Sequence, residues 1–461
     1  MPSYFLHSFY EVFMTPIEKR TVTTLALIYA LRMFGLFMVL PVLVIFASEY
    51  EGASATLIGV AIGAYGLTQA LLQLPFGVWS DRIGRKPVIL IGLTIFTLGS
   101  ALAASADSIW MLIAGRALQG AGAIASTLMA LMTDLTQEEN RTKAMASIGA
   151  SIGLSFTLAM VVGPAMATWL GLSGLFALTA VFSVAAMVLL VLAVPTPKQQ
   201  VRSRDARAFY HQLGDVVKDG QILRLSFGIF ALHAILVACF VAVPLMLLSA
   251  GLTQQDHWQV YLPVMMVSFV FMVPFIIIGE KKQKMKQVLL SAVVLLGISL
   301  AWLAMAGHEL IGLVSGLWLF FLAFNILEAS LPSLISKFAP AGFKGSAMGL
   351  YSTSQFLGAF AGGIIGGFLS GYASLSGVFW GMIPFVVVWA LMVMSMKTPK
   401  HLTSYMMSLT DSQVEDSDQL ELELLAIPGV HEVVIMLQEH AAYLKIDNKV
   451  FDPSKLNAYR N

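Results

Sequence analysis

Apolar segments of about twenty residues follow one another along most of this chain. A hydrocarbon core about 30 Å thick requires about 20 apolar residues per helix. Charged residues make up 11% of the sequence, whereas about 25% is usual in soluble proteins, so lipid must cover much of the apolar surface. We therefore expect an all-α membrane protein with twelve transmembrane helices. The twelve runs lie at about 21–48, 56–80, 87–105, 109–134, 142–168, 171–194, 223–250, 257–279, 287–306, 309–336, 343–371 and 374–396.

Basic residues lie almost entirely on one side of these runs. Apart from Arg32 and Arg116 well inside runs and a few in the tail, the 27 Lys and Arg residues precede the first run, follow the twelfth, occupy the even-numbered gaps, or lie within two residues of such a gap. The odd-numbered gaps contain none. The positive-inside rule then predicts a multi-pass protein of the bacterial inner membrane with both termini in the cytoplasm.

The runs divide into two groups of six. The gap 195–222 between them is the longest, and its segment "RAFYHQLGDVVKDG" has apolar residues at helical spacing, which is typical of a membrane-surface helix. "NRTKAMASIGASIG" (140–153) opens the fifth run, and the similar "FKGSAMGLYSTSQF" (343–356) opens the eleventh. These positions are equivalent, so we expect two six-helix pseudo-repeats, an arrangement of many transporters. The predicted domains are a cytoplasmic segment 1–20, bundles at 21–194 and 223–396 joined by the linker 195–222, and a cytoplasmic tail 397–461.

The tail has a different chemistry. An acidic amphipathic segment near 413–427 precedes "HEVVIMLQ" (431–438) and "AAYLKID" (441–447), which are typical of strands. We predict a small α+β domain there.

The segment "GVWSDRIGRKP" places four charges between the second and third runs. The simplest interpretation is that these four charges anchor a cytoplasmic turn at the membrane surface. The segment also resembles the loop signature Gly-x-x-x-Asp-Arg-x-Gly-Arg-Lys of the major facilitator superfamily. The resemblance implies a latch that joins the two halves in the outward-facing state, with the eleventh run as partner. Its residues are Gly77, which would allow close packing, Asp81, Arg82, Gly84, which suits a tight turn, Arg85 and Lys86.

Two further segments resemble motifs of this family. "RALQGAGA" (116–123) resembles its Arg-x-x-x-Gly motif, and "GPAMAT" (163–168) partly resembles a motif associated with antiporters through Gly163 and Pro164. Together with "LRMFGLFMVLPVL" (31–43) and a tail expected to be ferredoxin-like, the chain is similar to the YajR-type branch of drug-efflux transporters. Cys239 is the only cysteine, so the tail lacks the Cys-x-x-Cys pair of metal-binding ferredoxin-like domains. We expect no metal and no cofactor.

Four ionisable residues inside the runs are candidates for proton coupling. Such residues usually face a cavity or a partner. Glu328 is the only acid well inside a run, and His233 titrates near neutral pH when hydrated. Arg116 could tune the pKa of a nearby acid through its fixed positive charge, and Arg32 could line the cavity. Each residue also has a structural alternative. Glu328 could be an acid paired with another helix, and His233 could be a hydrogen-bonded histidine within its helix. Arg116 could extend to the membrane surface, and Arg32 could pair with an acid.

Uncharged polar residues inside the runs are candidates for a substrate cavity. Tyr65, Gln69 and Gln73 recur every four residues and form one stripe, which could also hold helices together. Asn325 and Gln355 complete the set.

These features predict a secondary transporter that works by alternating access, most simply as a proton-coupled exporter of small amphipathic molecules or drugs. A proton-coupled symporter or a uniporter of a sugar or metabolite is the alternative on the same fold. A membrane enzyme would need a nucleophile–base pair or metal ligands at membrane depth, and a sensor would depend on its tail. We expect a monomer whose partners are a small-molecule substrate, protons and lipid, with no nucleic acid and with a tail able to contact a regulator or ligand.

Overall fold

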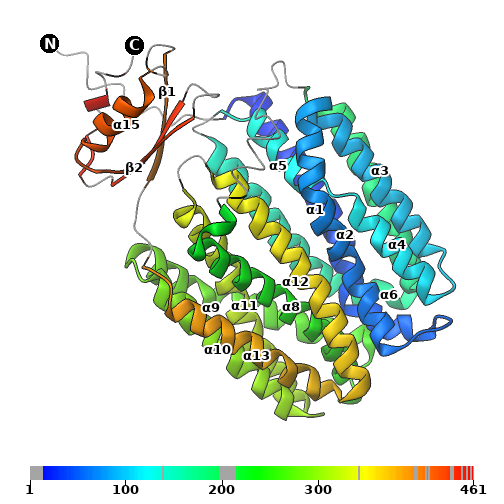
Figure 1. Cartoon of the computed structure of the whole chain (residues 1–461). Helices are drawn as coiled ribbons and strands as arrows, with labels where there is room; N and C mark the ends of the chain where they lie inside the picture. Colours follow the sequence, from blue (N-terminus) through cyan, green and yellow to red (C-terminus); the bar gives the residue numbers. More distant parts are fainter. Residues whose placement is uncertain are drawn as a thin grey trace.

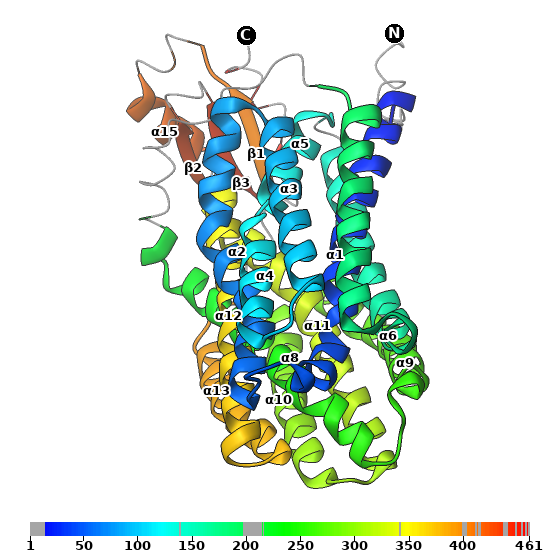
Figure 2. The same ribbon diagram turned by 90° about the vertical axis from the view of Figure 1, so that its right-hand side faces the viewer.

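Long helices form most of the computed structural model, and a small sheet domain lies at one end of them (Figure 1). The start of the first helix lies at the same end as this domain (Figures 1 and 2). The structure describes residues 14–137, 140–196, 214, 216–340, 343–398, 403–410, 413, 416–436, 441–447, 450–452, 455, 456 and 459. Most of the predicted membrane-surface segment 207–220, in the middle of the linker 195–222, lies outside these residues.

In the residues that the structure describes, the elements of the N-terminal half are α-helices and a short 3₁₀ helix. The first helix begins with a capping box, in which Thr15 and Glu18 satisfy each other's backbone N–H groups. The elements are α1 (Pro16–Phe46), η1 (Ala47–Glu49), α2 (Ala55–Ile83), α3 (Arg85–Ala104), α4 (Ile109–Ala121), α5 (Ala125–Asp134) and α6 (Arg141–Ala193).

The C-terminal half repeats the plan. Proline lies inside α8, α9, α11 and α13, where neighbouring helices can compensate for the lost backbone hydrogen bonds. The elements are α8 (Gly220–Ser249), η3 (Gln254–Asp256), α9 (Trp258–Lys281), α10 (Met285–Ala306), α11 (Leu310–Phe338), α12 (Lys344–Tyr372) and α13 (Leu375–Met394).

The predicted runs and the observed helices can be compared at three places. Within the described part of the chain, nine helical segments are long and apolar enough to cross a membrane. The fourth run is broken at Gly122 into α4 and α5. The fifth and sixth runs both lie in α6, but the non-helical backbone of Gly171, with a φ of 63°, divides this element into two helices at the predicted boundary. The glycine-rich α12 is not among the nine segments. With these taken into account, the helices form the two-repeat architecture that the sequence predicts.

The two ends of the bundle differ in charge. We call the end with the start of α1 and the turn between α2 and α3 the basic end, because Arg82, Arg85 and Lys86 lie there. The other end, which we call the acidic end, carries η1, η3 and the turns near 105–108 and 307–309. Its connections contain Glu49, Glu51, Asp107, Asp256 and Glu309 but no Lys or Arg.

The two halves share buried apolar residues in the part of the bundle nearer the acidic end. Val237 and Val241 of α8 belong to the same buried cluster as Met38 and Val42 of α1. Nearer the basic end, the buried cluster built on α1, α3 and α5 takes all of its buried members from the N-terminal half. The halves are therefore closed against each other at the acidic end.

Glycines bring α2 and α12 into close contact across the two halves. A Cβ atom added at Gly63 would lie 2.8 Å from the carbonyl oxygen of Phe360, and one added at Gly66 would lie 2.6 Å from that of Phe356. Gly59 similarly lies against Gly363 and Gly367. Only hydrogen fits between these backbones, as in other small-residue helix contacts.

The described part of the tail contains a three-stranded antiparallel sheet and the helix α15, which confirms the predicted small α+β domain. Its elements are β1 (Thr403–Ser408), α15 (Ser417–Leu425), β2 (Val430–Met436) and β3 (Ala441–Ile446). The strand order β1-β3-β2 is that of the first half of a ferredoxin-like fold. The sequence missed β1. Leu420 and Leu424 of α15 pack against one face of the sheet.

Candidate functional site

Arg32 lies at the centre of a hydrogen-bond network inside the N-terminal half. Its side chain is buried, and Nη2 donates to Tyr65 Oη at 3.0 Å, to Gln69 Oε1 at 2.9 Å and to the Gly122 carbonyl at 3.0 Å. Gln69 Nε2 in turn donates to Gln73 Oε1 at 3.4 Å. Gly122 follows the last residue of α4, so its carbonyl belongs to the negative end of that helix dipole. The predicted polar stripe of α2 therefore lies buried beside Arg32, and a cavity-lining role for it stays a prediction.

Arg116 is also enclosed by the N-terminal half. Its Nη1 donates to Gln119 Oε1 at 2.9 Å, and Nε donates to the Ala61 carbonyl at 3.3 Å. Gln119 Nε2 continues the network to Ser100 Oγ at 2.8 Å. Arg116 is 4% exposed and does not extend to the membrane surface. Within the described part of the chain, no carboxylate pairs with either arginine at 4.0 Å or less.

The C-terminal half brings three predicted polar residues together near the middle of the helices. His233 Nε2 of α8 lies 2.8 Å from the amide Nε2 of Gln355 on α12. The same ring nitrogen lies 4.0 Å from Glu328 Oε2 on α11. His233 is thus placed between two helices, with an amide on one side and a carboxyl group on the other.

Several polar atoms around this cluster are buried and have no hydrogen-bond partner. Glu328 Oε2 and the Asn325 amide nitrogen are two of them, both on α11. The hydroxyls of Tyr351 and Thr353 on α12 are two more. A buried polar group without a partner costs free energy, and functional sites are one place where this occurs. The cluster can therefore accept a proton or a polar ligand group.

Arg85 and Lys86 of the predicted latch contact other residues of the N-terminal half. Arg85 pairs with Asp81, and its Nε donates to Asp134 Oδ2 of α5 at 3.1 Å. Lys86 Nζ donates to the Val194 carbonyl at the end of α6 at 2.7 Å. Gly84 has a φ of 102°, as its predicted place in a tight turn requires. Gly77 is not needed for close packing, because a Cβ atom there would meet Ser126 Oγ only at an ordinary 3.5 Å.

The antiporter-like segment shows the internal symmetry of the fold. Gly163 lies in α6 against the backbone of Met38 in α1. The equivalent Gly366 in α12 lies against Ala238 in α8. Pro164 follows Gly163 inside α6. The fifth run therefore packs on the first as the eleventh packs on the seventh.

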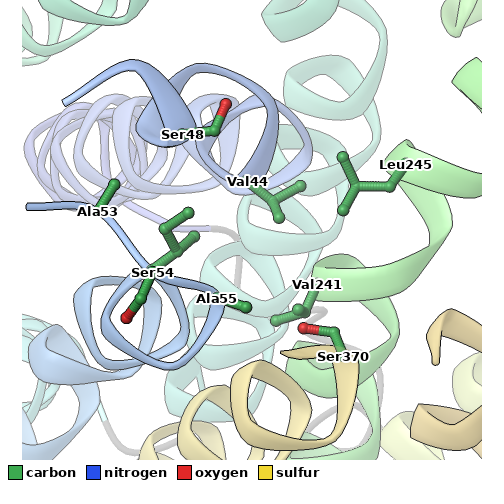
Figure 3. Close-up of a pocket in the computed structure, with 9 residues that line it drawn as sticks. Val44, Ser48, Ala53, Ser54, Ala55, Val241, Leu245 and Ser370 are labelled. Atoms are coloured by element: carbon green, nitrogen blue, oxygen red, sulfur yellow. The ribbon is translucent and has the colours of Figure 1, made fainter. Parts of the chain in front are cut away.

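A pocket of about 290 Å³ lies at the acidic end between α1, α2, α8 and α12 (Figure 3). Val44, Ile58, Val241 and Leu245 supply apolar walls. Ser48, Ser54 and Ser370 also line it. The pocket lies where the two halves meet, apart from the His233 cluster.

The sequence did not single out every member of these networks. Tyr351, Gln119 and Ser100 were missed because single hydroxyl and amide groups are common in apolar helices. The glycines of "RALQGAGA" were the available signal for the break between α4 and α5. In the described residues, no group of three or more His, Cys, Asp and Glu side chains could hold a metal ion.

The bundle of two repeated halves, with buried polar clusters at mid-depth, defines a membrane transporter rather than an enzyme. Residues 25–363 match the family model of the Major Facilitator Superfamily, and the chain belongs to this family. It is 47% identical to the inner membrane transport protein YajR of Escherichia coli over 95% of this chain and 96% of that protein. Residues 409–456 match the YajR YAM domain model.

Two other similarities are more distant. The multidrug resistance protein MdtH of Aeromonas hydrophila is 28% identical, over 79% of this chain and 90% of that protein. The crystal structure of a D-xylose–proton symporter aligns with a TM-score of 0.65 at 15% identity and covers 82% of this chain and 97% of the symporter. This last likeness concerns the fold alone.

Proposed function

We propose that this transporter exports small amphipathic molecules in exchange for protons, with His233 and Glu328 as the proton-coupling pair. The observation that carries the proposal is the position of His233 between Gln355 and Glu328. A transporter couples two fluxes when the binding of a proton changes the relative free energies of its two conformations. The cluster contains the parts for such a change.

Protonation of His233 would exchange its hydrogen-bond partner. With the Gln355 amide nitrogen facing the ring at 2.8 Å, the amide donates and His233 Nε2 accepts when the proton of the neutral ring is on Nδ1. A protonated ring carries N–H groups on both nitrogens, and its Nε2–H would then oppose the Gln355 amide and favour Glu328 Oε2, now 4.0 Å away. The ring would shift its bond from α12 to α11. Because α12 packs on α2 of the other half, this exchange can act on the contact between the halves.

The orientation proposed for the protein follows from its charges. The basic end lies in the cytoplasm by the positive-inside rule, which places both termini there. The relative YajR is an inner membrane protein by its name, and we propose the same membrane for this chain. The structure then represents a state closed towards the outside. We propose that the charges of 81–86 serve as the latch of the outward-facing state, as the resemblance of their segment implies.

The proposed substrates follow from the walls of the bundle and from the relatives. Phe37, Phe156, Phe321 and Phe324 form an aromatic group between the halves. Aromatic and apolar walls with a few polar groups suit amphipathic molecules. The name of MdtH supports drugs as substrates. We propose a monomer that requires no cofactor.

The test is a panel of compounds offered to the full chain in liposomes with an imposed pH gradient and an internal pH-sensitive dye. The panel contains amphipathic cations, neutral amphipaths, organic anions and sugars. We expect amphipathic members to move against their gradient and protons to move in the opposite direction. Uptake without any proton movement would refute proton coupling.

Symport of a sugar or metabolite is the second candidate, favoured by the polar groups without partners around Glu328. The same experiment separates the two candidates. In symport, addition of the substrate on one side moves protons in the direction of the substrate rather than against it.

A further inference from the structure

The tail sheet has a second face, and the helix α15 does not cover it. Successive side chains of a strand point to opposite faces. Ala442, Leu444 and Ile446 of β3 belong to the apolar core shared with α15. Ala441 and Lys445 therefore point away from α15, yet they are only 5% and 6% exposed. The buried lysine requires a specific partner.

The C-terminus of α11 provides that partner. Lys445 Nζ donates to the carbonyl oxygen of Lys337 at 3.3 Å, in the last turn of the helix. The carbonyls of a last turn lack partners within the helix, and the helix dipole favours a cation there. Glu432 on the neighbouring strand β2 pairs with Lys445 at 3.3 Å and offsets the cost of burying its charge. Lys445 thus caps a transmembrane helix from the tail.

The contact continues into a second helix. The side chain of Lys337 pairs with Glu280 Oε2 at 2.7 Å, near the end of α9, and Ser333 Oγ donates to Glu280 Oε1 at 2.8 Å. The tail is thereby linked to the ends of two helices of the C-terminal half. Glu328 lies nine residues before Lys337 on α11, which is about 14 Å along the helix axis. The tail therefore contacts the helix that carries the candidate carboxyl group.

We propose that the second face of the tail sheet is a docking surface for the basic end of α11, and that Lys445 holds the transporter in the state closed at the acidic end. The restraint depends on a contact between the tail and α11 that differs between the two conformations of the transporter. A contact made in one conformation only adds its free energy to that conformation. Alternating access moves the basic ends of the helices, and the cap on α11 restrains that movement. The inference requires alternating access but not protons as the coupling ion.

The experiment uses the full chain in nanodiscs, with Cys239→Ala as background and Val241→Cys as reporter. Val241 is 1% exposed between the two halves and lines the pocket at the acidic end, so a thiol there reacts with a maleimide only after that end opens. Lys445→Met removes the donor and keeps the length of the side chain. Lys455→Met is the matched control, because Lys455 is an exposed lysine of the same domain. Hydrogen–deuterium exchange of residues 330–338 reports on docking.

We expect Lys445→Met to speed exchange in 330–338 by about tenfold, the factor that loss of a hydrogen bond to a charged group gives, and to raise labelling of Val241→Cys several-fold. Lys455→Met should change neither. Unchanged exchange at 330–338 would overturn the docking surface, and unchanged labelling would overturn the restraint.

Exchange in residues 417–425 of α15 shows whether the tail stays folded. If Lys445→Met unfolds it, Lys445→Gln replaces that variant, because glutamine keeps a shorter neutral donor, and the same two measurements decide. The hydrogen–deuterium exchange and the maleimide labelling do not depend on a proton gradient. A failed proton-flux assay would therefore not affect them, and this proposal and the proposed function can fail separately.

Discussion

The buried charged residue Arg32 of the N-terminal half and the acid Glu328 of the C-terminal half have different surroundings. Arg32 donates to a tyrosine, a glutamine and a helix-terminal carbonyl, all in the N-terminal half. Its Nε and Nη1 atoms are buried without a hydrogen-bond partner among the described residues, and so is Glu328 Oε2 in the C-terminal half. The Glu328 side chain is 38% exposed. We propose Glu328, rather than Arg32, as the group that changes its charge during transport.

Glu328→Gln tests this assignment, because glutamine copies the shape of the protonated acid but cannot release a proton. We expect equilibrium binding of a transported panel compound to stay close to the parental value, while accumulation driven by a pH gradient falls to the passive level. Glu309→Gln is the control, since Glu309 is an exposed acid at the start of the same helix. Uphill transport at the parental rate in Glu328→Gln would direct the search to Arg116 and Arg32.

At the scale of helices, the contact between α2 and α12 decides how closely the halves approach. The glycines at positions 59, 63 and 66 recur every three or four residues and therefore form one ridge along α2. Gly363 and Gly367 present the matching surface on α12. A larger side chain at any of these glycines would require a whole helix to shift.

Gly63→Val should therefore separate α2 from α12 and disfavour the state closed at the acidic end. The added Cβ would lie 2.8 Å from the Phe360 carbonyl oxygen, which is backbone and cannot rotate away. We expect several-fold faster maleimide labelling of the Val241→Cys reporter. Gly149→Val is the control, because a Cβ atom there has nothing within 4 Å. Equal labelling in the two variants would show that the ridge does not set the closure.

The sequence predicted the helices well because each needs one continuous apolar run, but it could not predict where one run divides. Gly122 lies in an apolar run, and a glycine inside a helix costs only about 1 kcal/mol, so tertiary contacts such as the Arg32 hydrogen bond decide whether the helix breaks there. The short strand β1, "TSYMMS", lacks the alternation that identified β3.

The candidate site was only partly predictable for a similar reason. Glu328 and His233 stand out as ionisable residues inside apolar runs, but their separation depends on how α8 and α11 rotate about their axes. That rotation is set by packing across helices far apart in sequence. Tyr351, which is buried near Glu328, has no feature in the sequence that distinguishes it from other tyrosines.

At the scale of the whole molecule, the transporter and the tail are separate folding units joined by a small contact. The apolar core of the tail contains only tail residues, and the bundle clusters contain none of them. The helices satisfy their backbone hydrogen bonds internally, as a membrane requires.

Removal of residues 401–461 should consequently leave a folded, membrane-inserted bundle. We expect an unchanged far-ultraviolet helix signal per helical residue and a monodisperse profile in detergent, together with the increased Val241→Cys labelling of Lys445→Met. The full chain carrying Lys455→Met serves as the reference. Aggregation of the truncated protein would show that the tail is part of the structural core.

The glycine contact between α2 and α12 also has a genetic consequence. Every amino-acid change reachable from a glycine codon by one nucleotide introduces at least a Cβ atom, and here the facing atoms are main chain. Ordinary point mutation therefore offers no neutral intermediate at Gly59, Gly63 or Gly363. Drift at these codons should be confined to the third base, so that synonymous variation accumulates along a ridge whose protein sequence stays fixed.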